Sequence, residues 1–293
     1  MGYVRNRQAA TLRGGESGVI GLILCDICEP FYAEMTAGLS EALEAHDKLL
    51  FLTQSGRDGG LQRAFDALLA QGVDGIVLAG GIRAAAGLKE KAAEQGVPLV
   101  CVARSSGLDG VDVVRPDNMQ AAKLATEFLI SRGHSQIAYL GGQSDSLTRA
   151  ERLGGFCATL VQYGLPFRSE WIVECDCRQR QAAKRRSNCC AITRTLPPSS
   201  ATRHRWRSAP GLARAARSIG SDGVDAYYGR QVALIGFGDV PEAELTEPPL
   251  TFVSSSAREV GAAPPRLLQR IGDADLPAQN VILPPTLIRR GSA

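Results

Sequence analysis

The sequence lacks the apolar features that direct a chain to or through a membrane. No uninterrupted apolar run approaches the ~18 residues that a transmembrane helix needs, and the first residues, MGYVRNRQ, lack the apolar core of a secretory signal peptide. Gly2 does not start a myristoylation signal, because the sixth residue is Asn6 rather than serine or threonine. We therefore expect a cytoplasmic protein with no membrane partner.

Signatures of nucleotide, metal and disulfide sites are missing as well. No expected turn reads G-x-G-x-x-G or G-x-x-x-x-G-K-[ST], so a dinucleotide or P-loop site has little support. The eight cysteines of a chain this long, without a secretory signal, do not indicate a disulfide framework. Cys25 and Cys28 have CxxC spacing, yet no second pair or nearby histidine completes a metal site. We expect no cofactor and no metal.

Acidic residues are missing from one long segment. Between Cys177 and Ser221 the chain has ten arginines, one lysine and no Asp or Glu, so this segment carries a charge of +11. The whole chain carries +3, which leaves −8 for the remainder. The body of the protein is therefore mildly acidic, and its basic character comes from one stretch.

Residues 17–114 alternate between strand patterns and helical patterns. Val19–Leu24 is a continuous apolar run, typical of a strand that is covered on both faces. Helical spacing follows at Met35, Leu39 and Leu43. The alternation continues, with further strands expected at 49–53, 76–78, 99–103 and 111–114. Five strands with alternating helices predict one doubly wound α/β lobe.

The stretch Val111–Leu160 predicts two strand and helix units in a row. The first strand stops at Arg115–Asn118, and apolar residues then recur with helical spacing up to Gly133 and His134. Ile137–Leu140 reads as the next strand, and a glycine loop leads from it into a second amphipathic helix. We interpret His134 as a helix-end residue near the carbonyl dipoles rather than a ligand. Consecutive units of this kind predict a parallel sheet with ligand chemistry at the strand ends.

Several spaced motifs in this stretch resemble the effector-binding domain of LacI-type bacterial transcription regulators. They are D-N-x-x-A-A-x-x-A-T-E-x-L at Asp117–Leu129, G-H-x-x-I-A at Gly133–Ala138 and R-L-G-G-F at Arg152–Phe156. The phrase L-T-R-A-E-R, which ends at Arg152, is similar more narrowly to regulators of a maltose regulon. The resemblance covers residues 2 to about 175 and resumes from about residue 220 to the end.

The resemblance implies a fold like that of periplasmic binding proteins, α/β with two doubly wound parallel-sheet lobes joined by three hinge crossings. It also implies a small sugar-like effector, operator DNA as a partner of the intact parent protein, a homodimer, and no enzymatic chemistry. The crossings are expected near 112–118, 247–254 and 282–287. The expected N-terminal lobe is then 17–114 plus 250–281, and the C-terminal lobe is 115–249 plus 282–293.

Residues 1–16 resemble a remnant of the linker that connects a DNA-binding head to the ligand domain in this family. By position, Asn6, Arg7, Ala10 and Leu12 would form the hinge helix, whose leucine enters the minor groove as an apolar wedge. A solvated N-terminal tail is the alternative. No helix-turn-helix of about fifty residues precedes Gly2, so we expect the chain as written to bind operator DNA weakly or not at all.

The pattern fails at residues 177–218, the aberrant basic segment. This segment has no period of 2 or 3.6, contains Pro197–Pro198, and carries charge of one sign. The helix, strand and helix that such a lobe needs here are not evident. Our hypothesis is that the segment is translated out of frame, with one frame change near Ala183 and a compensating one near Ala213–Arg217. An arginine-rich arm for nucleic acid is the alternative.

The resemblance places the ligand at the loops that follow the strands. Phe31 and Tyr32, just after the first strand, offer aromatic faces to a sugar unless they cap the helix beneath them. Arg152 matches the family's ligand-contacting arginine, and its planar fork suits paired hydroxyls or a carboxylate. Thr148 matches a contact position by spacing. The candidate ligand residues are Asp26, Phe31, Tyr32, Arg104, Thr148, Arg152 and Asp239.

Some of these candidates have an equally good structural explanation. Asp26, Arg104 and Asp117 suit ligand contacts and also suit helix caps or hinge-locking groups. Asp239 follows an expected strand at 232–237, but the family's acid more often falls one residue earlier, where this chain has Gly238. A further departure is Pro264–Pro265, which would break the helix expected at 257–271.

The sequence leaves two other functions open. A sugar-binding receptor with the same two-lobed fold would need export, for which the sequence shows no signal. An enzyme would use Asp26 or Glu29 with Glu34, but no nucleophile, base and orienting group converge in the motifs. We therefore predict a repressor-type transcription regulator that senses a small sugar-like effector.

Overall fold

The computed structural model describes residues 16–55, 60–80, 87–103, 110–141, 146–173, 191–194, 233–238, 241–262, 269–271, 273 and 275–293. The chain divides into two compact units. The first unit consists of Met1–Pro116 and Ala257–Leu283, and the second of Asp117–Ser256 and Pro284–Ala293. The chain therefore passes between the units three times. Among the described residues, no helix is long and apolar enough to cross a membrane.

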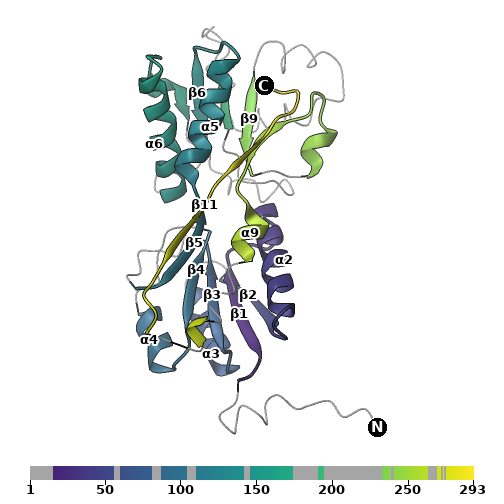
Figure 1. Cartoon of the computed structure of the whole chain (residues 1–293), viewed down its shortest axis with the longest axis vertical. Coiled ribbons are helices and arrows are strands. Elements are labelled where there is room, and N and C mark those ends of the chain that lie inside the picture. Colours follow the sequence, from purple (N-terminus) through teal and green to yellow (C-terminus); the bar gives the residue numbers. More distant parts are fainter. Residues whose placement is uncertain are drawn as a thin grey trace. The chain divides into compact units, whose positions relative to one another are not determined.

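The sheet of the first unit has the strand order β11-β5-β4-β3-β1-β2, and every neighbouring pair is parallel (Figure 1). In chain order its strands are β1 Val19–Leu24, β2 Leu49–Gln54, β3 Gly75–Ala79, β4 Leu99–Val102, β5 Asp112–Pro116 and β11 Asn280–Leu283. Its helices are α2 Pro30–Glu44, α3 Gly60–Ala70, α4 Leu88–Glu94 and α9 Ala257–Gly261. The five strands expected in residues 17–114 are confirmed.

Both faces of this sheet are covered. Along β1, Leu22 and Leu24 belong to a core cluster that includes Met35 of α2, whereas Ile23 belongs to a second cluster with Phe65 of α3. Successive side chains of a strand point to opposite faces, so one continuous apolar strand serves both cores. This arrangement explains why β1 has no polar residue along its length.

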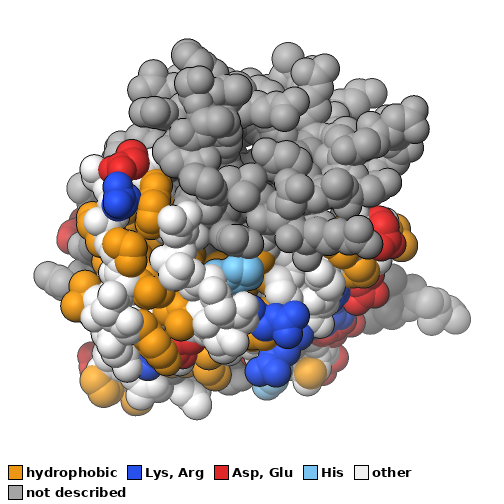
Figure 2. Space-filling view, turned by 90° about the horizontal axis from the view of Figure 1, so that it is seen from above, with side chains coloured by type: hydrophobic (Ala, Val, Ile, Leu, Met, Phe, Trp, Pro, Cys, Tyr) orange, Lys and Arg blue, Asp and Glu red, His pale blue; other side chains and the backbone are white. Residues whose placement is uncertain are grey.

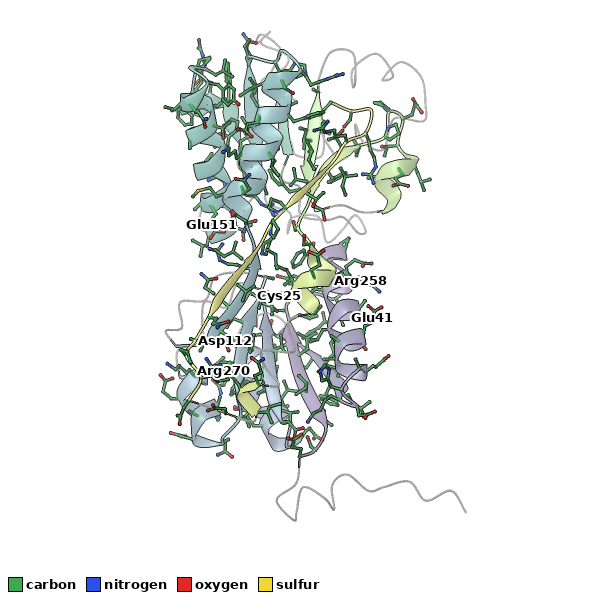
Figure 3. All side chains as sticks on the ribbon, viewed as in Figure 1. Cys25, Glu41, Asp112, Glu151, Arg258 and Arg270 are labelled. Carbon is green, nitrogen blue, oxygen red and sulfur yellow. The ribbon has the colours of Figure 1, made fainter. Side chains whose placement is uncertain are left out.

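Helices α2 and α9 lie unusually close together. A Cβ atom added at Gly38 would lie 2.1 Å from the backbone oxygen of Arg258, and one added at Gly261 would lie 2.0 Å from the backbone oxygen of Met35. Arg258 then reaches across α2 and pairs with Glu34 at 3.0 Å and with Glu41 (Figure 3). Two glycines thus allow the helix contact that a larger residue would prevent.

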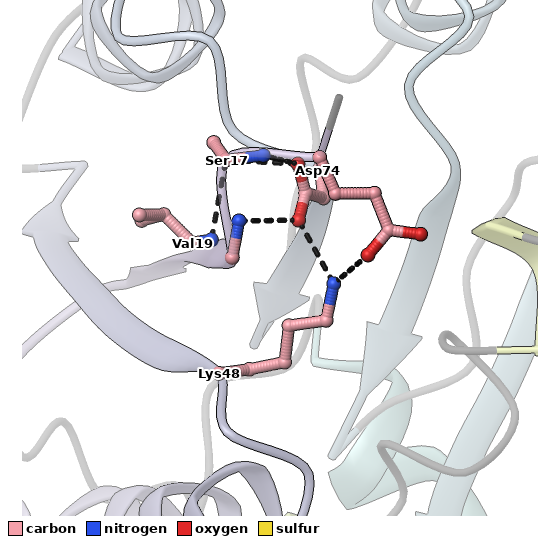
Figure 4. Close-up of polar contacts among 6 residues, drawn as sticks. Ser17, Val19, Lys48 and Asp74 are labelled. Atoms are coloured by element: carbon pink, nitrogen blue, oxygen red, sulfur yellow. Dashed lines mark hydrogen bonds and ion pairs between the residues drawn. The ribbon is translucent and has the colours of Figure 1, made fainter. Parts of the chain in front are cut away.

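An ionic cluster fixes the first described residues to the sheet (Figure 4). The Asp74 carboxylate accepts hydrogen bonds from the Ser17 amide at 2.7 Å, the Gly18 amide at 2.8 Å and the Lys48 ammonium at 3.0 Å. Burial alone would raise the pKa of the Asp74 carboxyl, but the hydrogen bonds from Lys48 and Ser17 outweigh it and hold that pKa below its ordinary value. Lys48 also pairs with Glu16.

The second unit has a six-stranded sheet with the order β12-β10-β9-β8-β6-β7. Its strands are β6 Ile137–Leu140, β7 Ile172–Val173, β8 Ala191–Arg194, β9 Leu234–Phe237, β10 Thr251–Ser254 and β12 Thr286–Ile288. Its helices are α5 Asn118–Ser131 and α6 Leu147–Gln162, and short 3-10 turns occur at Ser169–Trp171 and Pro241–Leu245. The core under α5 and α6 contains Ala125, Leu129, Tyr139, Phe156 and Leu160.

Three expectations about the second unit need correction. The sheet is mixed rather than fully parallel, because β8 is antiparallel to both β6 and β9 and β12 is antiparallel to β10. Strand β8 lies inside the aberrant basic segment, where we expected no regular element. An antiparallel neighbour does not require the long crossover connection that a parallel one needs. Residues 250–256 were assigned to the N-terminal lobe, but β10 pairs with β9 and β12. A short apolar run does not encode which of two sheets it joins.

The helix expected at 257–271 begins as predicted but is interrupted. Helix α9 ends at Gly261, and residues 269–271 are helical again. Pro264–Pro265 lie outside the described residues.

At the end of the second unit where α6 stops, large apolar side chains are exposed, as the view in Figure 2 shows for its described part. They include Val161, Tyr163 and Phe167.

Candidate functional site

In the first unit, the loop after β1 is shaped by its own backbone and side chains. Asp26 Oδ1 accepts a hydrogen bond from the Cys28 amide at 2.9 Å, and the Asp26 carbonyl accepts one from the Glu29 amide at 3.3 Å. The Ile27 amide donates to Gln54 Oε1, on β2, at 3.3 Å. Asp26 is exposed, and its Oδ1 holds the turn. Its ligand role stays a prediction.

The two aromatic candidates of the first unit have different environments. Tyr32 is only 6% exposed and belongs to the core with Met35 and Leu39, whereas Phe31 is partly buried and packs against that core. Their rings meet edge to face with centroids 5.6 Å apart. The Tyr32 hydroxyl also lies 2.5 Å from the position that a Cβ on Gly80 would take, at the end of β3. Tyr32 therefore packs in the core, and Phe31 is the more exposed of the two aromatic candidates.

In the second unit, Arg152 is the centre of a polar cluster. Its side chain is buried on α6, with 7% of the residue exposed. Its Nε donates to Asn118 Oδ1 at 3.0 Å, and Asn118 Nδ2 donates to Glu151 Oε2 at 2.8 Å. The guanidinium carbon lies 4.5 Å from the ring centroid of Phe237, at the end of β9. Figure 3 labels Glu151 where α6 begins in this unit.

The starts of two helices bring these residues together. Asp117 caps α5 by accepting a hydrogen bond from the Gln120 amide at 2.9 Å, which sets Asn118 as the first helical residue. A Cβ atom added at Gly155 of α6 would lie 2.2 Å from the backbone oxygen of Met119, so the two helices touch at this point. Arg152 lies three residues before Gly155 on α6, so the contact between the two helices places its guanidinium group beside Asn118.

Thr148 and Arg149 occupy the first turn of α6. Thr148 is partly buried, and Arg149 donates from Nε to the backbone oxygen of Gly141, the residue after β6, at 3.1 Å. Ser146 caps the helix, accepting the Arg149 amide at 3.5 Å. The expected contact position at Thr148 therefore lies at the carboxyl end of β6, beside the start of α6.

Sequence reasoning missed two members of the Arg152 cluster. Asn118 stands in the D-N motif, but only its neighbour Asp117 was considered, and Asp117 acts as a helix cap. Phe237 was interpreted only as the last residue of an apolar strand. His134 follows the end of α5 and donates its amide to Leu129 O at 3.1 Å, as expected of a helix-end residue. Within the described ranges, no three His, Cys, Asp or Glu residues form a cluster that would hold a metal ion.

Several predicted residues lie outside the described residues. They are Arg104 and Asp239 of the ligand set and Asn6, Arg7, Ala10 and Leu12 of the hinge. Their roles stay predictions. Gly238, which precedes Asp239, has a left-handed φ of 79°, a conformation that glycine adopts without strain.

Comparison with known families and proteins gives a consistent result. Residues 17–288 match the family described as periplasmic binding proteins and sugar binding domain of LacI family. The maltose regulon regulatory protein MalI of Escherichia coli (strain K12) is 48% identical over 98% of this chain and 85% of that protein. The transcriptional regulator DegA of Bacillus subtilis (strain 168) is 27% identical over 100% of this chain and 86% of that protein.

Solved structures agree with the fold. A complex of the transcriptional regulator CelR with cellobiose is 26% identical, with a TM-score of 0.74, and the match covers 98% of this chain and 89% of that one. A lac repressor dimer bound to operator and the anti-inducer ONPF has 20% identity and a TM-score of 0.74, with 99% of each chain covered. At that identity the second likeness concerns the fold alone.

Proposed function

The chain belongs to the LacI family of periplasmic binding proteins and sugar-binding domains, and from this premise we propose that it is the effector-sensing part of a transcriptional repressor. Its effector is a small sugar-like molecule. The observation that carries the proposal is the Arg152 cluster, a buried guanidinium between an amide and an aromatic ring at the start of α6. Planar polar groups beside an aromatic face are the combination that sugar hydroxyls and C–H surfaces require.

Effector binding would act by favouring one arrangement of the two units. The chain passes between them after Pro116, Ser256 and Leu283, and a few linker residues at such passages absorb a hinge rotation. A ligand shifts this equilibrium only by its difference in affinity for the two arrangements. We propose Phe31 and Asp26 in the first unit, and Arg152 and Thr148 in the second, as effector-contacting residues.

A second copy of the chain is the partner we propose for the edge of the first sheet. Strand β2 is an edge strand, and Leu49, Phe51 and Leu52 are 54%, 47% and 36% exposed. An exposed apolar edge strand is unfavourable in an isolated protein and is usually covered by a partner. The homodimer would present two linker segments to operator DNA, with Asn6, Arg7, Ala10 and Leu12 as the DNA-contacting hinge. As a regulator of transcription it would act in the cytoplasm, without enzymatic turnover.

A thermal-shift screen of the purified chain tests the sensing role. Maltose is the first sugar to add, because the 48% identical relative is named for the maltose regulon. A sugar that binds the folded state at a concentration of 100 times its Kd stabilises it by about 2.7 kcal/mol. Glycerol at equal concentration controls for nonspecific stabilisation by a polyol. The proposal fails if no sugar or sugar derivative raises the melting temperature beyond the glycerol control.

A further inference from the structure

Cys25 and Cys28 lie on the short loop that joins β1 to α2, the first strand and helix of a parallel βαβ unit; Cys25 is labelled in Figure 3. Both cysteines are exposed. A CxxC sequence between the strand and the helix of such a unit is typical of a dithiol that forms a reversible disulfide. The Arg152 cluster, in the second unit, does not use this pair, so its spacing needs an explanation of its own.

The segment between the two cysteines is folded into a turn. The Asp26 carbonyl accepts a hydrogen bond from the Glu29 amide at 3.3 Å, and Asp26 Oδ1 accepts one from the Cys28 amide at 2.9 Å. The Ile27 amide donates to Gln54 Oε1, on β2, at 3.3 Å. Closing a loop this short costs little chain entropy. Each thiol therefore meets the other at a high effective concentration, which favours reaction within the pair over reaction with another molecule.

The other described cysteines have different environments. Cys101, on β4, is only 4% exposed and belongs to a core cluster. Cys157, on α6, is partly buried, and burial raises the pKa of its thiol. A buried or protonated thiol reacts slowly, because the thiolate is the nucleophile. Among the cysteines that the structure describes, Cys25 and Cys28 are therefore the accessible pair.

We propose that Cys25 and Cys28 are a redox modification site, which a small-molecule disulfide such as oxidised glutathione converts to an intramolecular disulfide. One thiolate of the pair attacks the small-molecule disulfide, which gives a mixed disulfide and releases one reduced thiol. The second cysteine attacks the mixed disulfide, and the Cys25–Cys28 bond forms as the second reduced thiol leaves. The protein loses two electrons and two protons, and the two released thiols carry them. An excess of dithiothreitol reverses the reaction.

The disulfide restrains the loop that holds Asp26 and leads to Phe31. Asp26 lies between the two cysteines, and Phe31 follows Cys28 by three residues. Under the proposed function both are effector contacts, so the link from oxidation to sensing rests on that function, whereas formation of the disulfide does not. A covalent ring around Asp26 reduces the number of conformations open to the loop. We therefore expect slower amide hydrogen exchange in residues 26–31 of the oxidised chain.

Mass mapping of the full chain tests the modification. Trypsin cleaves after Arg13 and Lys48, and the peptide between them contains Cys25 and Cys28 and no other cysteine. The folded chain is incubated with oxidised glutathione, and the remaining thiols are blocked with N-ethylmaleimide. We expect this peptide to lose two hydrogen atoms, to carry no label, and to take up both labels after reduction with dithiothreitol. Cys25→Ser should leave Cys28 as a mixed disulfide with glutathione, whereas the control Cys157→Ser should still form the Cys25–Cys28 bond.

Two mapping results would overturn the modification site. One is a peptide that keeps both labels after oxidation, and the other is a bond from Cys25 or Cys28 to any other cysteine in place of the bond between them. Hydrogen exchange of the oxidised and reduced chains tests the effect on the loop, and equal exchange in residues 26–31 would overturn that effect. Neither measurement uses an effector, so failure here leaves the sensing function to be judged by the thermal-shift screen.

Discussion

A buried ion pair ties the edge strand of the first sheet to its neighbour. Asp112 is 1% exposed and pairs with Arg270 Nε, and its Oδ1 accepts a hydrogen bond from Arg270 Nη2 at 3.3 Å (Figure 3). The same oxygen accepts the Gln279 amide, which directly precedes β11, at 2.6 Å. One carboxylate on β5 therefore holds both a buried guanidinium and the start of the last strand of this unit.

Replacing Asp112 with alanine should destabilise the first unit strongly. The substitution breaks the buried ion pair between Asp112 and Arg270, a change that costs about 3–5 kcal/mol. The conversion of about 2–4 °C per kcal/mol for domains of 150–250 residues gives a fall of about 6–20 °C in melting temperature. Urea unfolding and differential scanning calorimetry measure these two quantities. The double variant with Arg270→Ala should lose less than the sum of the single losses, because both single substitutions remove the same ion pair.

Lys123→Ala is the control for this experiment. Lys123 and Glu127 form a partly exposed pair at 3.9 Å on α5, and ion pairs at the surface contribute about 0–1 kcal/mol. A loss below about 1 kcal/mol for Asp112→Ala would refute the reasoning, because it would mean that Arg270 regains solvation without cost.

Three further predictions concern stability and assembly. The pKa of Asp74 is lowered in the folded protein, so its contribution to stability is present above its ordinary pKa of about 3.9 and is lost as pH falls through the lower folded value. Asp74→Asn should therefore reduce the fall in unfolding free energy toward low pH, measured by urea unfolding from pH 2 to 6. An unchanged pH dependence contradicts this prediction. Gly38→Ala should destabilise the protein by about 1–3 kcal/mol through a clash between the new Cβ atom and α9. The control Gly154→Ala, whose Cβ atom would have its nearest neighbour 3.8 Å away, should be neutral or stabilising. Equal unfolding free energies of the two variants in urea would exclude the close contact. Phe51→Glu on β2 should shift the chain toward monomer in sedimentation experiments, while the control Leu245→Glu, at an 86% exposed residue, should not.

The local elements were predictable because their signals are local. The continuous apolar run of β1 follows from burial on both faces, and the helical spacing of α5 follows from its one buried stripe. The R-L-G-G-F motif drew attention to Arg152, whose ligand role stays a prediction. Tyr32 is ambiguous from the sequence, since an aromatic residue after a strand suits a ligand or a core equally well. The structure shows that it packs in the core with Met35, and its ligand role stays a prediction.

Long-range pairings were not predictable from the pattern. Asp112 and Arg270 are 158 positions apart, and Asn118 and Arg152 are 34 apart. No periodicity in the chain connects such partners, because only the crossing of elements in three dimensions brings them together. The same reason applies to β10, whose apolar pattern is compatible with either sheet, and to β8, whose antiparallel pairing uses a segment without helical or strand period.

The central claim is that this chain senses a small effector through the Arg152 cluster. The most direct measurement is calorimetric titration of the effector found by the thermal-shift screen into the wild-type chain, the Arg152→Ala variant and the exposed control Arg168→Ala. The account predicts a loss of about 1.5–3 kcal/mol in binding free energy for Arg152→Ala, the usual contribution of hydrogen bonds to a charged group, and no loss for Arg168→Ala. Equal affinity of all three proteins for that effector would contradict the claim.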